Sequence, residues 1–421
     1  MIKKILFLII VFYSLSFSQQ RILIPMDFSQ TDHLKAYGVA YFSIKSGVDV
    51  DWLLNYRGGS FMIDYHDLIV MECRLRAVAF EVISAGESAQ IIAEISQIDN
   101  NMDIVKLEKT PKIAVYVPPG FLPWDDAVTL ALEYAEIPYD HVWDSEVLEG
   151  KLIEYDWLHL HHEDFTGQYG KFYRDFHTTD WYIKQVNLNE AEARKNSFQK
   201  VSELKKAVAQ AIKSYIAGGG FLFAMCSATD TYDIALAAED VDICDRYYDY
   251  DPPDVDFNKR IDYSKCIAFH NFTIDTDPLR YEYSDIDVPP NDMAQFVSPD
   301  NDYFTLFEFS AKYDPVPTML TQCHVNVIKG FLGQTSSFKK ELIKRSVTLL
   351  AQGNGIEDVK YIHGNVGRGT FTFYGGHDPE DYRHFVYAEP TDLNLHKNSP
   401  GYRLILNNVL FPAAKKKQQK T

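Results

Sequence analysis

Short apolar runs alternate with longer amphipathic stretches through the middle of the chain, and this spacing predicts strands followed by helices. Four apolar runs predict buried strands, at residues 112–117, 141–143, 155–161 and 221–225. Helices are predicted over residues 125–135, where two aspartates favour a helix N-terminus, and over a long stretch at 187–216. Strands that alternate with helices are typical of a parallel, doubly wound sheet, so we predict an α/β fold of the flavodoxin-like type.

The last of these strands ends at Cys226, between a run of three glycines (218–220) and a second predicted helix at 232–238. This pattern indicates a sharp turn from strand to helix, and Ala224 and Ala228 supply the small neighbours that such a turn needs. A cysteine on this turn lies at the carboxyl edge of the sheet and faces a helix N-terminus, which favours the thiolate. The alternative is a buried structural thiol.

The pattern differs before this region, where residues 19–110 predict an N-terminal α+β unit rich in strands. Residues 21–25 resemble a strand, residues 37–45 alternate, and residues 48–61 resemble a strand that enters a glycine turn. A helix is predicted over 89–98, with Ser88 as its N-cap.

A second change of pattern occurs at residues 239–335, which are acidic, aromatic and rich in proline. Alternating stretches such as 303–309 predict an acidic, β-rich insertion or lid. Residues 338–352 then predict a helix that returns the chain to the sheet. Two final strands are predicted at 360–363 and 369–374. The resulting division is an α/β domain at 111–238 and 336–412, the insertion between them, and a disordered basic tail at 413–421.

Residues 1–18 resemble a secretory signal peptide. Two lysines precede an apolar core that is too short to span a bilayer, and Ser16 and Ser18 stand where signal peptidase requires small residues. We therefore expect a periplasmic or secreted protein with no membrane insertion after the signal is removed.

Composition narrows the classes of partner. The formal net charge is −18, which argues against nucleic acid and anionic membranes. The 46% hydrophobic content suits a large folded core. The five cysteines form no CxxC pair, so at least one thiol stays unpaired. We expect a small molecule or an envelope protein as partner, and no cofactor.

A base for Cys226 is predicted near the other end of the chain. Gly375-Gly376-His377 closes a predicted strand, so His377 is expected at the same sheet edge as the cysteine. Glu380 follows three residues later and is expected to orient the imidazole. The backbone N–H groups of Gly120 and Ser227 are candidates for an oxyanion hole.

This order of cysteine, histidine and carboxylate resembles the class I glutamine amidotransferase-like superfamily, over residues 112–238 and 338–411. The resemblance implies that Cys226 is a nucleophile for amide or ester hydrolysis. The segment around Cys226 lacks the glycines and glutamine of the amidotransferase motif, and Glu380 lies three residues after His377 rather than two. The pattern is therefore more similar to the divergent ThuA-like branch.

The whole chain is also similar to a group of secreted Bacteroidota proteins that carry the name asparagine synthetase B. The residues do not match that chemistry. Glutamine-dependent asparagine synthetases expose an N-terminal cysteine and carry a Ser-Gly-Gly-x-Asp-Ser loop, whereas residue 2 here is isoleucine and that loop is absent.

A second cluster of candidate residues occupies 159–164. The alternation predicts that His159 and His161 share one face of the sheet, and His161 or His162 is expected to reach the pocket of Cys226. His159, His161 and Glu163 are possible metal ligands, although core packing and a solvated loop are the more frequent outcome for such residues. Three functions thus stay open: a cysteine hydrolase, a non-catalytic binding or assembly module, and a metal-dependent hydrolase.

Overall fold

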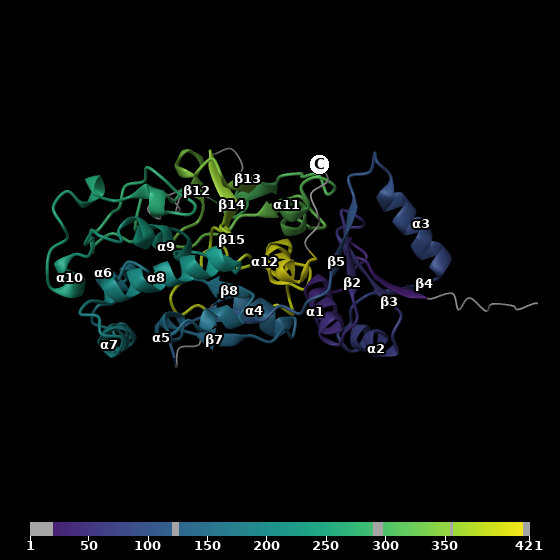
Figure 1. The fold of residues 1–421 in the computed structure, drawn as a ribbon, viewed down its shortest axis with the longest axis horizontal. Coiled ribbons are helices and arrows are strands. Elements are labelled where there is room, and N and C mark those ends of the chain that lie inside the picture. Colours follow the sequence, from purple (N-terminus) through teal and green to yellow (C-terminus); the bar gives the residue numbers. More distant parts are fainter. Residues whose placement is uncertain (1–19, 120–125, 289–297, 354–356, 416–421) are drawn as a thin grey trace, which may run out of the picture.

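The computed structural model describes residues 20–119, 126–288, 298–353 and 357–415. Two β-sheets organise the chain, with helices on the faces of the larger one (Figure 1). The predicted signal peptide and Gly120 lie outside the described residues. Within those residues, no helix is long and apolar enough to cross a membrane.

The smaller sheet is formed by the N-terminal part of the chain and is antiparallel throughout, in the order β4-β1-β3-β2-β5. Its strands are β1 (Arg21–Ile24), β2 (Val50–Leu54), β3 (Ser60–Asp64), β4 (Glu81–Ile83) and β5 (Asp103–Leu107). Its helices are α1 (His33–Lys45), α2 (Asp67–Leu75) and α3 (Ala85–Ser96). Asp32 caps α1, where its side chain accepts a hydrogen bond from the Lys35 N–H.

The larger sheet is mixed, in the order β11-β10-β13-β14-β15-β9-β8-β6-β7, and β12 pairs with β14. Five neighbouring strands are parallel: β6 (Ile113–Tyr116), β7 (Asp140–Val142), β8 (Trp157–Leu160), β9 (Phe221–Met225) and β15 (Gly369–Tyr374). The others are antiparallel: β10 (Tyr303–Leu306), β11 (Val327–Lys329), β12 (Phe338–Lys339), β13 (Thr348–Gly353) and β14 (Asp358–Val366). The predicted α/β class is therefore confirmed, with five parallel strands inside a mixed sheet.

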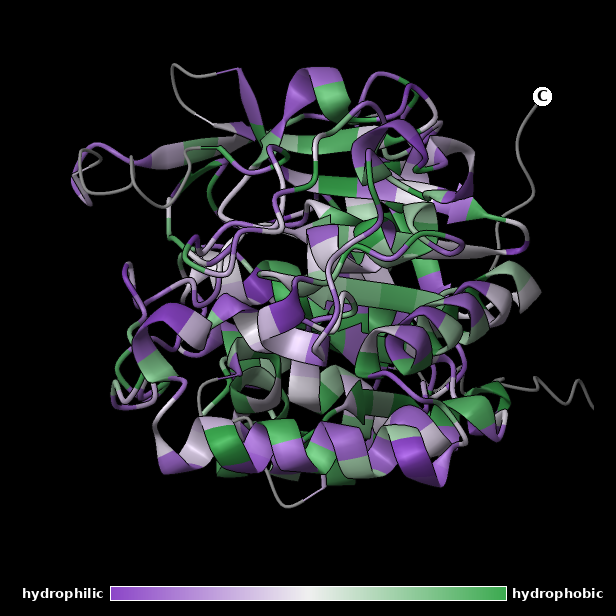
Figure 2. Cartoon of the chain, turned by 90° about the vertical axis from the view of Figure 1, so that its left-hand side faces the viewer, coloured by the Kyte–Doolittle hydropathy of each residue, from purple (hydrophilic) through white to green (hydrophobic). Residues whose placement is uncertain are grey.

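Helices pack on both faces of this sheet. On one face α4 (Ala127–Tyr134) and α12 (Pro400–Leu410) lie against each other, and α1 joins them from the N-terminal part. On the other face α8 (Val201–Gly218) packs against α5 (Asp144–Leu148), α7 (Asp180–Lys195) and α9 (Ala228–Ala237). Two apolar cores result, one on each face. Figure 2 shows the strands coloured largely hydrophobic in the middle of the molecule.

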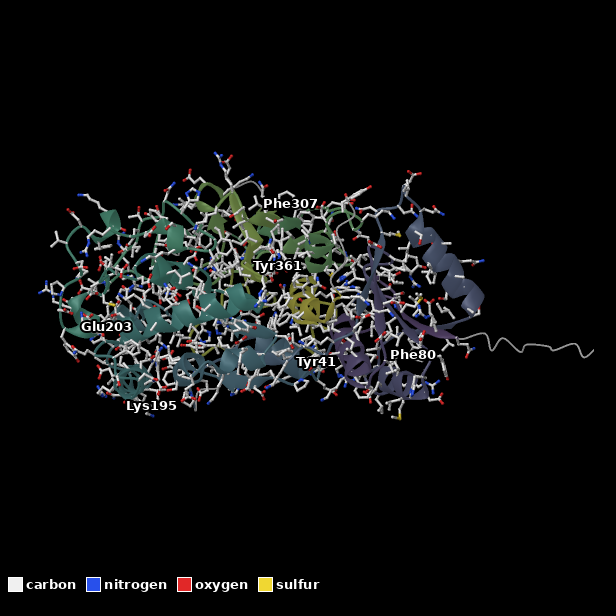
Figure 3. All side chains as sticks on the ribbon, viewed as in Figure 1. Tyr41, Phe80, Lys195, Glu203, Phe307 and Tyr361 are labelled. Carbon is white, nitrogen blue, oxygen red and sulfur yellow. The ribbon has the colours of Figure 1, made fainter. Side chains whose placement is uncertain are left out.

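The core on the α1 side is continuous from the N-terminal sheet to the larger sheet. Two tyrosines labelled in Figure 3 contribute to this continuity. Tyr41 donates a hydrogen bond from its hydroxyl to the carbonyl of Pro111 (3.1 Å), and the Tyr361 hydroxyl accepts one from Asn408 of α12 (2.6 Å). The two sheets are therefore joined by shared packing as well as by the connecting chain.

The segment at 239–335 differs from the prediction. Among its described residues only β10 and β11 are strands, and both extend the larger sheet. The remainder is loop and short helices, including α10 (Arg246–Asp249) and α11 (Pro315–Leu320). Phe269, Phe272 and Ile286 are buried in the same core as α8 and α9. The β-rich character that we predicted for the whole segment is therefore wrong, because its apolar residues pack from loops.

Two segments form a different secondary structure from the one their sequence pattern indicates. Residues 37–45 alternate, yet they lie in α1, because their buried positions face both α2 and the α4–α12 pair. Residues 338–352 have apolar positions with helical spacing, yet they form β12, a short turn and the start of β13. Here pairing with β14 and β10 overrides the local pattern.

Three boundaries also differ. The helix predicted at 89–98 begins at Ala85, because Ser84 and Glu87 form a capping box. The long helix predicted at 187–216 is two helices, α7 and α8, which Ser197 separates with a left-handed φ of 67°. The first residues of the predicted tail pack on the protein, since the Lys415 side chain pairs with Glu108 at 3.0 Å, and residues 416–421 lie outside the described residues.

Candidate functional site

The carboxyl ends of β8, β9 and β15 meet at one edge of the larger sheet. Leu160 is paired with Ala224, and Met225 is paired with Tyr374, so the three strands end at nearly the same level. The Cys226 N–H donates a hydrogen bond to the carbonyl of Gly376 (3.1 Å). Residues that follow these strands are therefore neighbours in space.

Cys226 occupies a strained turn between β9 and α9. Its φ is 50°, in the left-handed region that non-glycine residues adopt at a cost of about 1–2 kcal/mol. Ser227 is the N-cap residue of α9, and the N–H of Ala228 donates to the carbonyl of His161 (3.0 Å), which fixes the turn against the end of β8. The side chain is buried, with Cys226 only 2% exposed. The turn predicted from the sequence is thus present.

Backbone amides surround the sulfur. The Gln334 N–H donates to Cys226 Sγ at 3.3 Å, and the amides of Thr335 and Ser227 also favour the thiolate. Burial nevertheless raises the pKa of the Cys226 thiol to about 11, because it outweighs these donors. The resting group is a neutral thiol whose ionised form already has hydrogen-bond donors in place.

Residues 331–337, which we call the covering segment, carry two of these amides. Lys360 of β14 holds this segment with its buried ammonium group, which donates to the carbonyls of Phe331 and Ser336, the latter at 2.6 Å. Burial lowers the pKa of Lys360 to about 8. Gly376 lies beneath the segment with a φ of 93°, and a Cβ there would fall 2.5 Å from the Phe331 ring.

Two buried carboxyl groups hold the other end of the covering segment. Asp287 accepts hydrogen bonds from the N–H groups of Ser336 (2.8 Å) and Ser337 (3.2 Å). Asp230 of α9 accepts one from the Thr335 hydroxyl (3.0 Å). Burial raises the pKa of Asp230 to about 7 and that of Asp287 well above its ordinary value. Buried ionisable groups therefore position the amides over Cys226.

His377 lies in a cluster of imidazoles. Its ring centroid is 4.4 Å from that of His161 and 5.9 Å from that of His162. His384 stacks parallel to it at 4.3 Å. Ring nitrogens of His161, His162 and His377 lie within 4.8 Å of one another. His161 and His162 thus lie beside His377, and the expectation that one of them reaches the pocket of Cys226 stays a prediction.

Asp126 organises the inner side of the cluster. Its carboxylate lies 3.2 Å from Nε2 of His159 and 3.0 Å from Nδ1 of His161. Burial acts to raise the pKa of Asp126, but the two histidines outweigh it and hold the pKa well below its usual range. Burial lowers the pKa of His161, which keeps it neutral.

The structure gives three of the predicted site residues, Glu380, His159 and Glu163, surroundings that the sequence did not predict. Glu380 Oε2 lies 2.9 Å from Nδ1 of His396, so one carboxylate oxygen has another partner, and the orienting role predicted for Glu380 stays a prediction. His159 belongs to the Asp126 side of the cluster. Among the described residues, Glu163 joins neither of the two histidine groupings that could hold a metal ion, and the set His159, His161 and Glu163 stays a prediction.

Sequence reasoning missed Asp126 and the covering segment. Asp126 was visible only as an acid at the start of a helix, and its side chain does cap α4, where it accepts from the N–H groups of Val128 and Thr129. Its contact with β8 depends on the crossover between strands. The covering segment carries no local motif, and the predicted boundary at 335/336 divides it.

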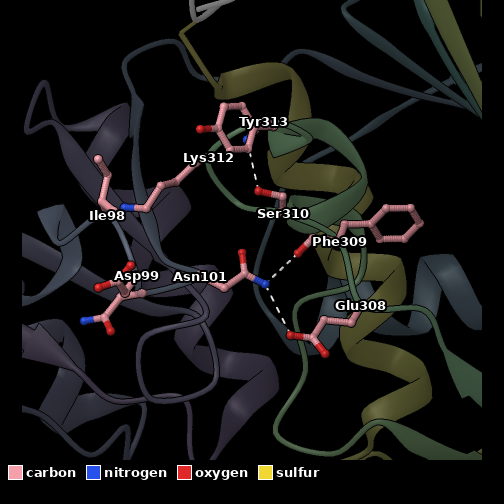
Figure 4. A pocket seen from close by; sticks show the side chains of 9 residues that line it. Ile98, Asp99, Asn101, Glu308, Phe309, Ser310, Lys312 and Tyr313 are labelled. Atoms are coloured by element: carbon pink, nitrogen blue, oxygen red, sulfur yellow. Dashed lines mark hydrogen bonds between the residues drawn. The ribbon is translucent and has the colours of Figure 1, made fainter.

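A shallow groove of about 340 Å³ lies elsewhere (Figure 4). It is lined by residues 98–101, 308–310, 312 and 313. Asn101 bridges its two sides by donating to the carbonyl of Phe309 (2.8 Å). None of the groove residues belongs to the site around Cys226.

No protein family matches the chain, and no curated protein matches it. Among solved structures, the chain is similar to a cytoplasmic protein of Salmonella typhimurium LT2, with 12% identity, 64% of this chain and 90% of that chain covered, and a TM-score of 0.34. A second Salmonella typhimurium cytoplasmic protein has 9% identity, coverage of 72% and 100%, and a TM-score of 0.34. A GH42 β-galactosidase has 9% identity, coverage of 64% and 28%, and a TM-score of 0.28.

Proposed function

We propose that the protein is an exported, cysteine-dependent hydrolase of an amide or ester, built on an amidotransferase-like α/β fold. The observation that carries this proposal is the strained turn at Cys226, whose sulfur accepts a backbone N–H and whose own N–H donates to Gly376, the residue before His377. Backbone strain of this kind persists where the surrounding structure requires it, and it is concentrated at functional sites.

The strand order supports the finer fold assignment. The parallel strands lie in the order β7-β6-β8-β9-β15. Numbered along the chain, this order is 2-1-3-4-5, which is the flavodoxin-like arrangement. In such sheets a ligand binds beyond the carboxyl ends of the strands, where Cys226 and His377 both lie. The resemblance to the ThuA-like branch of the amidotransferase-like superfamily is part of the same proposal.

The chemistry follows from the neutral state of the thiol. Because burial raises the pKa of Cys226 to about 11, His377 would remove the proton as the sulfur attacks the substrate carbonyl. The carbonyl carbon would form a thioester with Cys226, and the bond to the leaving nitrogen or oxygen would break. His377 would return the proton to that leaving group. Water would then hydrolyse the thioester and regenerate the thiol, releasing the acid.

The test is hydrolysis by Cys226→Ala, with Cys244→Ala as the matched control. Both cysteines are buried, but only Cys226 lies on the strained turn. A panel of chromogenic amides and esters, together with a thiol-reactive probe read by mass spectrometry, gives the two readouts. We expect Cys226→Ala to lose hydrolysis by about a thousand-fold or more and to lose labelling at this position, while Cys244→Ala keeps both.

Thermal unfolding establishes that each variant is folded. Hydrolysis that survives in folded Cys226→Ala would contradict a cysteine nucleophile. A wild-type protein that neither hydrolyses the panel nor reacts with the probe at Cys226 would contradict the proposal as well, and would favour the non-catalytic binding module.

A further inference from the structure

We propose that His161, His162 and His377 form a binding site for one divalent transition-metal ion, with Asp126 as the carboxylate that orients His161. The three ring nitrogens lie within 4.8 Å of one another. Neighbouring ring centroids are 4.4 Å apart for His161 and His377 and 5.1 Å apart for His161 and His162. Three imidazoles that follow β8 and β15 thus lie together at the carboxyl edge of the sheet.

Buried ring nitrogens without a hydrogen-bond partner are a reason to expect a bound ligand in this cluster. His161 is 2% exposed, and its Nε2 has no hydrogen-bond partner among the described residues. Nδ1 of His162 is also buried, and it too lacks a partner within the described part of the chain. A buried polar atom without a partner costs about 1–3 kcal/mol. A metal ion coordinated by these nitrogens removes that cost.

Asp126 supplies the outer contact that metal-binding histidines usually have. Its Oδ1 lies 3.0 Å from Nδ1 of His161, which leaves Nε2 of His161 as the coordinating atom. His159 contacts the other oxygen of Asp126 at 3.2 Å and holds the carboxylate in place. A carboxylate behind a ligating histidine fixes the ring orientation and strengthens the ligand. Asp126 and His159 thus position His161 and are not themselves proposed as ligands of the metal ion.

The ligand set selects the class of metal. Three neutral imidazoles suit zinc, cobalt or nickel and are poor ligands for calcium or magnesium. A tetrahedral zinc ion with Zn–N distances of about 2.0–2.1 Å places its ligand nitrogens roughly 3.4 Å apart. The nitrogens lie within 4.8 Å of one another, so small side-chain rotations bring them to that spacing. The fourth position stays open to water or substrate.

Metal binding has a consequence that rests on the proposed function. A His377 nitrogen that coordinates a metal cannot also accept the proton of Cys226. Zinc should therefore inhibit cysteine-dependent hydrolysis, and a chelator should restore it.

The primary test measures binding without any activity. The mature protein is treated with a chelator, dialysed and titrated with Co²⁺ and Zn²⁺ by absorbance spectroscopy and calorimetry. We expect one ion per chain, with d–d bands typical of a nitrogen-rich tetrahedral or five-coordinate site. His162→Ala should weaken binding by at least about ten-fold, and Asp126→Asn by about 10- to 100-fold.

His141→Ala is the matched control, since His141 is an exposed histidine of a neighbouring parallel strand, and it should bind as the wild type does. His162→Gln serves as a second variant if His162→Ala does not fold. Stoichiometric binding that is equal in wild type, His162→Ala and Asp126→Asn would overturn the proposed ligands, as would the absence of binding in the wild type.

Cys226→Ala separates this proposal from the proposed function. It should bind the metal as tightly as the wild type, whatever the outcome for hydrolysis. If hydrolysis requires the metal and survives in Cys226→Ala, the metal site is supported and the cysteine mechanism is overturned.

Discussion

At the scale of single residues, the site depends on ionisable groups that are buried. Asp230 accepts hydrogen bonds from the Thr335 hydroxyl (3.0 Å) and the Ser284 hydroxyl (3.3 Å), and burial raises its pKa to about 7. Lys360 lies on β14, next to β15, and its ammonium group is buried. Together these groups hold the covering segment over Cys226, at a cost in stability that changes with pH.

We predict that Asp230→Asn stabilises the protein more at about pH 8 than at about pH 5. The pKa of Asp230 in the folded state is raised above its ordinary 3.8 to about 7. The free energy of unfolding therefore decreases as the pH rises from about 4 to about 7, and this loss remains at higher pH. The asparagine keeps an acceptor for Thr335 and carries no charge. The free energy of unfolding in urea at the two pH values measures the effect.

The exposed residue Asp99 provides the control, since Asp99→Asn should change stability equally at both pH values. The prediction fails if Asp230→Asn shows no difference between the two pH values.

At the scale of elements, the covering segment and the end of β15 fit together with no spare room. The His377 N–H donates to the carbonyl of Leu332 (2.9 Å), and the Gly376 N–H donates to that of Thr335 (2.7 Å). A Cβ on Gly333 would lie 2.8 Å from the backbone nitrogen of His377. The segment that carries the sulfur-facing amides is therefore fixed by backbone contacts to the strand that carries the base.

We predict that Gly333→Ala destabilises the protein by about 1–3 kcal/mol, because a methyl group must displace backbone rather than a flexible side chain. Gly218→Ala is the matched control. It lies at the exposed end of α8, and nothing is within 4 Å of the Cβ it would gain. Its effect should be within about 0.5 kcal/mol or stabilising. Equal losses in the two variants, measured by urea unfolding, would contradict the fit described here.

At the scale of the whole molecule, a buried arginine joins the N-terminal sheet to the larger sheet. Arg403 of α12 is fully buried and donates to the carbonyls of Met26 (3.1 Å) and Gly58 (2.8 Å). Nδ1 of His324 lies 3.0 Å from Nη1 of Arg403 and accepts from it. The ring of His33 stacks on His324 at 4.3 Å. This junction requires a neutral His324.

We predict that acid weakens this junction through His324. Burial and the neighbouring Arg403 lower the pKa of His324 to about 3, below its ordinary 6.5, so the unfolded chain takes up the proton first. The free energy of unfolding therefore decreases as the pH falls from 6.5 toward 3. His324→Gln should have a shallower decrease over this range. His141→Gln, at an exposed position, should keep the wild-type slope, and an unchanged slope in His324→Gln would refute the prediction.

The sequence determined the elements whose patterns are local: the parallel strands, the glycine stop before β9 and the turn at Cys226. It also indicated that Cys226, His161 and His377 follow strands, because β15, β9 and β8 each end in a short, recognisable signal. Residues 338–352 were mistaken for a helix because their pairing partners are distant in sequence.

Only the tertiary structure decided what surrounds these residues. Asp126 reaches β8 through a crossover, His161 and His162 come beside His377 from a different strand, and Lys360 and Asp230 hold the covering segment from either side. Each of these contacts joins residues far apart in the chain. Their energies depend on burial and on neighbouring charges, which a local pattern of polar and apolar positions does not contain.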